Sequence, residues 1–104
     1  MKGYHYSMAE GIIFQIDLSQ SVGNRINNLI LETSNIPLDP NQKYKVAMNS
    51  YRANGGGGLM SAANAQDAPV LYKSSVEIRN ILIDYLQKKG SIDAEVDGNW
   101  KLVY

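Results

Sequence analysis

Hydrophobic and polar positions alternate along residues 11–18, where an apolar side chain recurs at every second residue. A period of two predicts a β-strand with one buried face. Residues 25–33 have a strongly apolar content and residues 43–49 alternate again, so each segment predicts a further strand. Turn residues separate the three segments, around Gly23 and across 35–42.

Between residues 74 and 90 the apolar period changes to that of a helix. Ser74 and Glu77 have the spacing of a capping box, while two lysines and Gly90 mark the last turn and the end. The apolar stripe of this predicted helix consists of Ile78, Ile81, Leu82, Tyr85 and Leu86.

Two segments complete the predicted architecture. Residues 50–69 are rich in Gly, Ala, Asn and Ser and predict a long irregular segment, followed by a short strand at 70–72. Residues 100–104 alternate once more after an Asp97-Gly98 turn signal, which predicts a final strand. Together the elements predict an α+β fold in a single domain, 1–104. It has a mixed or antiparallel sheet of four to five strands and one main C-terminal helix.

Composition narrows the classes of function. A chain of 104 residues buries roughly two-thirds of its unfolded surface without disulfides. Ten basic residues balance ten acidic ones, so no net charge attracts a nucleic-acid polymer. The absence of Cys excludes thiolate chemistry, and no stretch reaches the roughly 18 apolar residues of a membrane span. The opening residues are too polar for a signal peptide, which favours a cytosolic protein or a piece of a longer one.

The residue types of common catalytic centres are sparse. His5 is the single histidine, and acidic residues alternate only in the exposed turn 93–97. The glycines at 55–58 lack the Gly-Lys-Ser/Thr ending of a phosphate-binding loop. Met60 stands where a dinucleotide fingerprint needs its last glycine. From its residues alone the chain is a binding or structural domain, with no catalytic or metal-ligating residues predicted.

The aromatic residues divide into two groups. Tyr6 and Tyr51 lie outside the periodic stripes, each at a predicted strand end, and Tyr51 opens the glycine run. Glycines let a backbone approach a ligand closely, and an aromatic ring beside them suits a flat, stacked ligand. The alternative is structural, with both rings buried and the glycines in a disordered loop. Four other aromatics lie on periodic apolar faces and are expected in the core: Phe14, Tyr44, Tyr85 and Trp100.

Several motifs together resemble a known family. They are Tyr4-His5-Tyr6-Ser7-Met8-Ala9-Glu10-Gly11, Tyr44-Lys45-Val46-Ala47, Asn49-Ser50-Tyr51-Arg52-Ala53-Asn54-Gly55-Gly56-Gly57 and Gly98-Asn99-Trp100. Over nearly its whole length the chain resembles the C-terminal domain of the 5'-nucleotidase family. The opening motif and the Asn-Trp ending look most similar to the 2',3'-cyclic-nucleotide 2'-phosphodiesterase/3'-nucleotidase branch.

The resemblance implies a nucleoside-binding role. Members of the family stack the base between two aromatic rings, at positions that correspond to Tyr6 and Tyr51 here. Their Asn-Gly-Gly backbone lies near the sugar and base, and this pattern matches Asn54, Gly55 and Gly56. Gly57 stands where classical members carry an aspartate for the ribose hydroxyls, which agrees with the cyclic-phosphodiesterase branch.

The resemblance also implies a larger parent protein. An N-terminal metallophosphoesterase domain with two divalent metal ions would hydrolyse the phosphoester in nucleotide catabolism. This chain, without that domain and the segment of phosphate-contacting arginines, would catalyse nothing alone. Export to the periplasm, cell wall or exterior is expected for the parent. The alternative is a stand-alone, non-catalytic ligand-binding or interaction module with the same fold.

Overall fold

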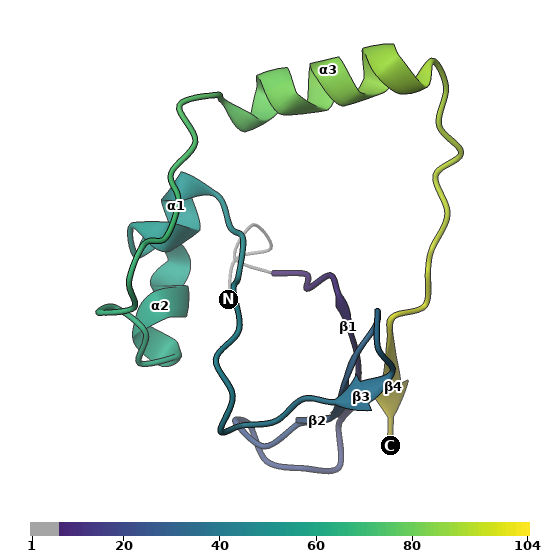
Figure 1. Cartoon of the computed structure of the whole chain (residues 1–104). Coiled ribbons are helices and arrows are strands. Elements are labelled where there is room, and N and C mark those ends of the chain that lie inside the picture. The colour runs from purple at the N-terminus through teal and green to yellow at the C-terminus, as the bar shows by residue number, and fades with distance from the viewer. Residues whose placement is uncertain (1–6) are drawn as a thin grey trace. The chain divides into compact units, whose positions relative to one another are not determined.

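The structure, a computed structural model, describes residues 7–104 and combines a four-stranded sheet with a few helices (Figure 1). The described residues divide into two compact units: one consists of residues 7–44 and Glu95–Tyr104, the other of Lys45–Ala94. The sheet belongs to the first unit and the helices to the second. This arrangement confirms the predicted α+β class.

The sheet of the first unit is mixed, with the strand order β3-β2-β1-β4. The central pair, β1 and β2, is antiparallel, as is the pair of β2 and β3, whereas β4 runs parallel to β1. The parallel pairing joins segments from opposite ends of the chain. The strands are β1 (Ile12–Asp17), β2 (Ile26–Leu31), β3 (Ile36–Pro37) and β4 (Trp100–Val103).

The register places the two largest aromatic side chains of the sheet on one face. Phe14 of β1 lies opposite Trp100 of β4, and directly opposite residues of neighbouring strands share a face. The pairing of β1 with β2 is irregular between Ile13 and Gln15. Asn28 has a positive φ of 53° at this bulge, and its side chain donates a hydrogen bond to Gln15 Oε1 at 2.7 Å.

Asn99 attaches the end of the chain to its beginning. Its side-chain amide donates to the carbonyls of Ala9 at 2.7 Å and Ile12 at 3.1 Å, while its own carbonyl accepts from Phe14 N at 2.9 Å. The residue is only 3% exposed. A buried amide whose hydrogen bonds are made specifies a position more sharply than an apolar contact, and here it fixes β4 beside β1.

The second unit contains short helices where the sequence predicted an irregular segment over 50–69. Asn49 begins α1 because its Oδ1 accepts from Arg52 N at 2.9 Å, an N-cap bond that the prediction missed. The helical elements are α1 (Ser50–Ala53), the 3₁₀ turn η2 (Gly56–Gly58), α2 (Leu59–Ala62) and α3 (Ile78–Lys89).

Two predicted strands are wrong. Residues 43–49 and 70–72 have no regular secondary structure, and Val46 and Val70 are largely exposed. An alternating pattern gives a segment one apolar face, but a β-strand also needs a neighbouring strand to bond with. Without such a neighbour, an alternating segment does not become a strand. The third strand of the sheet lies instead at Ile36–Pro37, inside the segment predicted as a turn. Its proline suits a short edge strand, because proline lacks the N–H that a central ladder needs.

The predicted helix is present, but its start differs from the expected capping box. Glu77 is the N-cap residue and makes no side-chain cap bond, while Ser74 Oγ accepts from Val76 N at 3.0 Å in a local turn. The predicted end is confirmed: Gly90 has a φ of 79° and its N–H donates to the Leu86 carbonyl at 2.9 Å. Tyr85 was expected in the core but is 52% exposed. The other residues of the apolar stripe are about half exposed as well.

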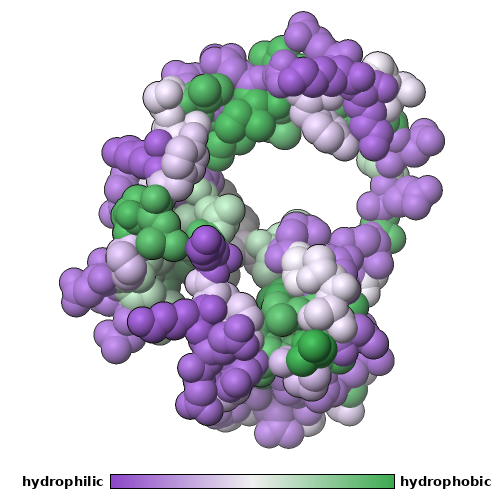
Figure 2. All heavy atoms as spheres, viewed as in Figure 1, coloured by the Kyte–Doolittle hydropathy of each residue, from purple (hydrophilic) through white to green (hydrophobic). Residues whose placement is uncertain are grey.

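The hydrophobic side chains of residues 7–104 are only partly buried. Phe14, Tyr44 and Trp100 are half-buried, and none of the described hydrophobic side chains is fully buried. Leu18, placed by its alternation on the buried face of the first strand, is exposed. Figure 2 shows hydrophobic residues at the surface of the sheet unit and of α3. Within the described residues, no helix has the length and apolar character required to cross a membrane.

Candidate functional site

Tyr51 is the aromatic residue of the candidate site. It is the second residue of α1, immediately before the glycine run, and it is 53% exposed. The exposure contradicts the alternative in which this ring is buried. A half-exposed tyrosine on a helix offers a rigid apolar surface together with a hydroxyl group, a combination common at ligand contacts.

A tight chain reversal follows α1. The backbone N–H of Asn54 donates to the Ser50 carbonyl at 2.9 Å and ends the helix, and Gly55 then adopts a left-handed φ of 97°. Gly57 and Gly58 are also left-handed, with φ values of 72° and 73°. Residues that carry a side chain rarely adopt this backbone conformation, which explains the glycines. The glycine run is therefore an ordered turn, not a disordered loop.

Gly56 has a different reason to be glycine. A Cβ built on it would lie 2.5 Å from the Tyr51 carbonyl oxygen and 2.6 Å from the ring atoms Cε2 and Cζ of the same tyrosine. The Tyr51 ring therefore packs directly on the Gly56 backbone. The close approach predicted from the glycines is present, but the group that approaches is the tyrosine of the site itself.

Arg52 supplies the positive charge of the site. Its Nη1 donates to the Gly56 carbonyl at 3.4 Å, and its Cζ lies 5.7 Å from the centroid of the Tyr51 ring. The residue is half-buried, although both of its chain neighbours are exposed. Arg52 was not among the sequence-predicted site residues; the available signal was its position four residues before Gly56.

The sequence-predicted site residues fall in one short segment, with one exception. Tyr51 lies in α1, Gly56 and Gly57 lie in η2, and Asn54 and Gly55 connect the two elements. Asn54 is exposed at the end of α1, and its side chain is accessible to a ligand. The second predicted ring, Tyr6, lies outside the described residues. The arrangement provides one stacking surface, one amide side chain and one cation within seven residues.

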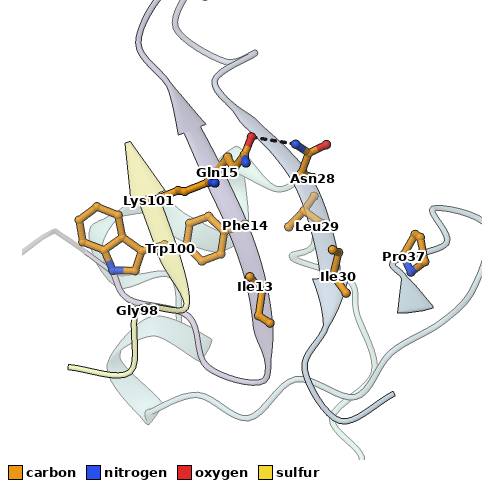
Figure 3. A pocket seen from close by; sticks show the side chains of 10 residues that line it. All are labelled: Ile13, Phe14, Gln15, Asn28, Leu29, Ile30, Pro37, Gly98, Trp100 and Lys101. Atoms are coloured by element: carbon orange, nitrogen blue, oxygen red, sulfur yellow. Dashed lines mark hydrogen bonds between the residues drawn. The ribbon is translucent and has the colours of Figure 1, made fainter. Parts of the chain in front are cut away.

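A second surface feature is a hollow in the sheet unit, of about 470 Å³ (Figure 3). Phe14 and Trp100 line it on one side, and the hydrogen-bonded pair of Gln15 and Asn28 lines it on another. Among the described residues that line the hollow, Lys101 is the one with a cationic side chain. Sequence reasoning placed both aromatic rings in the core, and it had no signal for the parallel β1–β4 pairing that brings them together.

Across the described part of the chain, no three His, Cys, Asp or Glu side chains are grouped as a metal ion would require. The described residues therefore do not fit the two metal ions that the resemblance implies for the parent protein, and no metal-dependent step is assigned to them.

The comparisons with known proteins agree with the motifs. Residues 2–65 match the family model described as the 5'-nucleotidase C-terminal domain. The chain belongs to this family. The matched residues include every sequence-predicted site position, and α3 and β4 lie beyond them.

Three curated relatives extend the similarity over almost the whole chain. A trifunctional nucleotide phosphoesterase protein from Bacillus subtilis is 27% identical, and the match covers 97% of this chain and 7% of that protein. Two proteins named 2',3'-cyclic-nucleotide 2'-phosphodiesterase/3'-nucleotidase are also similar. The one from Haemophilus influenzae is 28% identical and the one from Salmonella typhimurium 30%, with 96% and 95% of this chain covered. The chain spans 17% of the length of each of these two. No solved structure matches it significantly.

Proposed function

We propose that this chain is a substrate-binding domain of a nucleotidase or cyclic-nucleotide phosphodiesterase, and that it binds the base of a nucleoside or nucleotide on the ring of Tyr51. The observation that carries the proposal is the half-exposed Tyr51 ring on an ordered glycine turn. Family membership and the names of the relatives support it. A π surface of this kind stacks on any base, because every base has a π face.

Each residue of the turn has a distinct task in the proposal. Tyr51 stacks on the base, and Asn54 offers one amide that both donates and accepts hydrogen bonds. The exposed backbone of Gly55 and Gly57 offers further polar groups to the ligand. Neither residue has a side chain that would keep the ligand away from the backbone. Tyr6 is proposed as the second ring, on the opposite face of the base.

The parent protein belongs to the proposal as well. A metallophosphoesterase domain outside this chain would hold two divalent metal ions and hydrolyse the phosphoester, and this chain would hold the nucleoside. The parent would act in nucleotide catabolism after export from the cytoplasm. The named activities of the relatives support hydrolysis of nucleotide phosphoesters, and the small share of their length that this chain covers leaves room for a catalytic domain.

The expected affinity is low. Stacking of a base on an aromatic side chain contributes about 1–3 kcal/mol, so two rings contribute about 2–6 kcal/mol before ordering costs. Since about 1.4 kcal/mol corresponds to a tenfold change, a Kd near millimolar or somewhat tighter is expected for this chain alone. Purines should bind somewhat better than pyrimidines because their stacking face is larger.

Amide-resolved NMR titrations with adenosine and with ribose 5-phosphate test the proposal. Adenosine should shift the resonances of Tyr51 and residues 54–58, and ribose 5-phosphate should not. Substitution Tyr51→Ala should weaken adenosine binding by about 5- to 150-fold, the equivalent of one lost stacking contact. Tyr72→Ala is the matched control, because Tyr72 is 84% exposed on an irregular segment and has no glycine turn beside it. Equal losses in both variants, or no shifts at ten millimolar adenosine in a folded sample, would reject the base-stacking role.

A further inference from the structure

We propose that Arg52 is a positioning residue that holds the Tyr51 ring against Gly56 and so presents the exposed part of the ring to a ligand. The positioning itself is a property of the ligand-free chain. Its consequence for binding rests on the proposed function of Tyr51. No sequence motif or comparison assigns this role to Arg52.

The Tyr51 ring, the Gly56 carbonyl and the Arg52 guanidinium lie close to one another. The Tyr51 ring packs on Gly56, the Arg52 guanidinium donates to the Gly56 carbonyl at 3.4 Å, and the same guanidinium lies 5.7 Å from the ring centroid. The ring, the carbonyl and the cation therefore define one another's positions. A displacement of Arg52 releases two of the three contacts at once.

Burial supports the same assignment. Arg52 is half-buried on a four-residue helix whose other members, Ser50, Tyr51 and Ala53, are all exposed. An arginine on a surface helix normally extends its charged end into water. Here the guanidinium folds back toward the glycine turn that follows the helix, where the planar group can donate to a carbonyl and face a ring at the same time.

The guanidinium–ring contact alone is too long to account for the positioning. Cation–π attraction acts within about 6 Å of the ring centroid, and 5.7 Å is near that limit. The bond to the Gly56 carbonyl supplies the second point of attachment. We therefore expect a variant that keeps the donor but loses the charge to retain part of the effect.

Positioning should appear in the affinity as a modest factor. An exposed tyrosine samples several rotamers, and a ligand that selects one of them loses that freedom on binding. If Arg52 already selects the rotamer, its removal should weaken adenosine binding by about 2- to 10-fold. This loss is smaller than the loss expected for removal of the ring itself.

The chain contains a natural control for this design. Lys89 Nζ lies 5.8 Å from the centroid of the Tyr85 ring on α3, a cation–ring distance almost equal to that of Arg52 and Tyr51. Tyr85 is also about half exposed, but no glycine turn lies against it. Lys89→Ala therefore removes the same kind of contact at a place with no proposed site.

The test is aromatic NMR on the full 104-residue chain without ligand, followed by adenosine titration. In the wild-type chain, nuclear Overhauser effects should connect the Tyr51 ring protons with the Gly56 α-protons. Arg52→Ala should abolish them and move the ring shifts toward those of a free tyrosine. Arg52→Gln keeps a donor for the carbonyl and should restore part of the effect, and Lys89→Ala should leave the Tyr51 signals unchanged. Arg52→Gln also serves if Arg52→Ala fails to fold.

The outcomes separate this inference from the proposed function. Unchanged nuclear Overhauser effects between Tyr51 and Gly56 in the folded Arg52 variants would overturn the positioning role, whether or not adenosine binds. If the wild-type chain and Arg52→Ala bind adenosine with the same Kd, Arg52 has no effect on affinity, and the proposed function remains intact. Lost effects in Arg52→Ala, together with no adenosine binding by the wild-type chain, would support the positioning and reject the proposed function.

Discussion

Gly56 and Tyr51 depend on each other at the scale of single residues. The ring occupies the space in which a Gly56 side chain would lie, so the identity of one residue determines the conformation of the other. A glycine can be required because its own φ is positive, or because a neighbour occupies its Cβ position. Gly55 is an example of the first reason and Gly56 of the second.

This difference predicts unequal effects of two alanine substitutions. Gly56→Ala should displace the Tyr51 ring and destabilise the turn by about 1–3 kcal/mol, because a Cβ cannot remain 2.5 Å from a backbone oxygen. Gly55→Ala meets no atom within 4 Å and should cost about 1–2 kcal/mol of left-handed strain without moving the ring. The Tyr51 ring shifts and urea denaturation measure both effects. Identical ring shifts in the two variants would show that the packing on Gly56 is absent in solution.

Asp17 provides a second prediction at this scale. The Ser19 hydroxyl donates to its carboxylate at 2.6 Å and the Ser19 backbone N–H at 2.9 Å, and these bonds lower the pKa of Asp17 below 3.8. Because the pKa is lower in the folded state, the bonds contribute stability above pH 3.8, and this contribution is lost as the pH falls through the folded-state pKa. Ser19→Ala should raise the pKa of Asp17, and NMR titration of the carboxyl carbon should show the rise. An unchanged midpoint would mean that the backbone bond alone holds the shift.

At the scale of the element, Asn99 links the start of β4 to β1 through its hydrogen bonds. Asn99→Ala would remove the donor from the carbonyls of Ala9 and Ile12, and an unsatisfied buried group costs about 1–3 kcal/mol. We expect a loss of that size in urea denaturation and faster hydrogen exchange at the Phe14 amide, which bonds to the Asn99 carbonyl. Asn24→Ala, which removes an exposed amide bonded to Ser21, should cost less than about 0.5 kcal/mol. A loss in Asn99→Ala no larger than that of this control would contradict the role of Asn99 in the sheet.

The elements also show where sequence patterns are sufficient. The strands at 11–18 and 25–33 are confirmed as β1 and β2, because a short antiparallel pair carries its partner nearby in the chain. The strand at 43–49 is wrong although its alternation is just as regular, because no strand pairs with it. The end of α3 at Gly90 is confirmed because it depends only on local backbone geometry. Its N-cap lies at Glu77, almost one turn later than the Ser74 of the predicted capping box, since the Ser74 hydroxyl bonds to the nearby Val76 N–H.

At the scale of the whole molecule, apolar surface is the main feature of the described residues. Large exposed apolar patches in a folded protein usually mark a surface that another chain or segment covers. The chain should therefore bind a hydrophobic dye such as anilinonaphthalene sulfonate and increase its fluorescence. The double substitution Ile81→Glu and Leu86→Glu on α3 should reduce that signal without a change in far-ultraviolet circular dichroism, because both side chains are exposed. No dye fluorescence from the wild-type chain would show that these faces are covered in solution.

The sequence proposed the residues of the candidate site but did not predict how they contact one another. The aromatic followed by glycines predicted Tyr51 and the turn, because stacking and close approach need those residue types, and the family resemblance added Asn54. It did not predict that the Tyr51 ring itself packs on Gly56, or that Arg52 lies against both. These contacts depend on a chain reversal between η2 and α1, which no single-residue preference specifies.

The sequence by itself determined the properties that are local. It determined the α+β class, the first two strands, the turns at Gly23 and Gly98, the end of α3 and the family, since each depends on periodicity, on left-handed glycine or on a contiguous motif. Only the tertiary structure decided which segments pair and which side chains meet. The parallel β1–β4 pairing, the buried amide of Asn99 and the two-residue edge strand join positions that are distant in the chain or carry no strand pattern. These features are stabilised by long-range hydrogen bonds, which form only when the rest of the fold places distant segments of the backbone side by side.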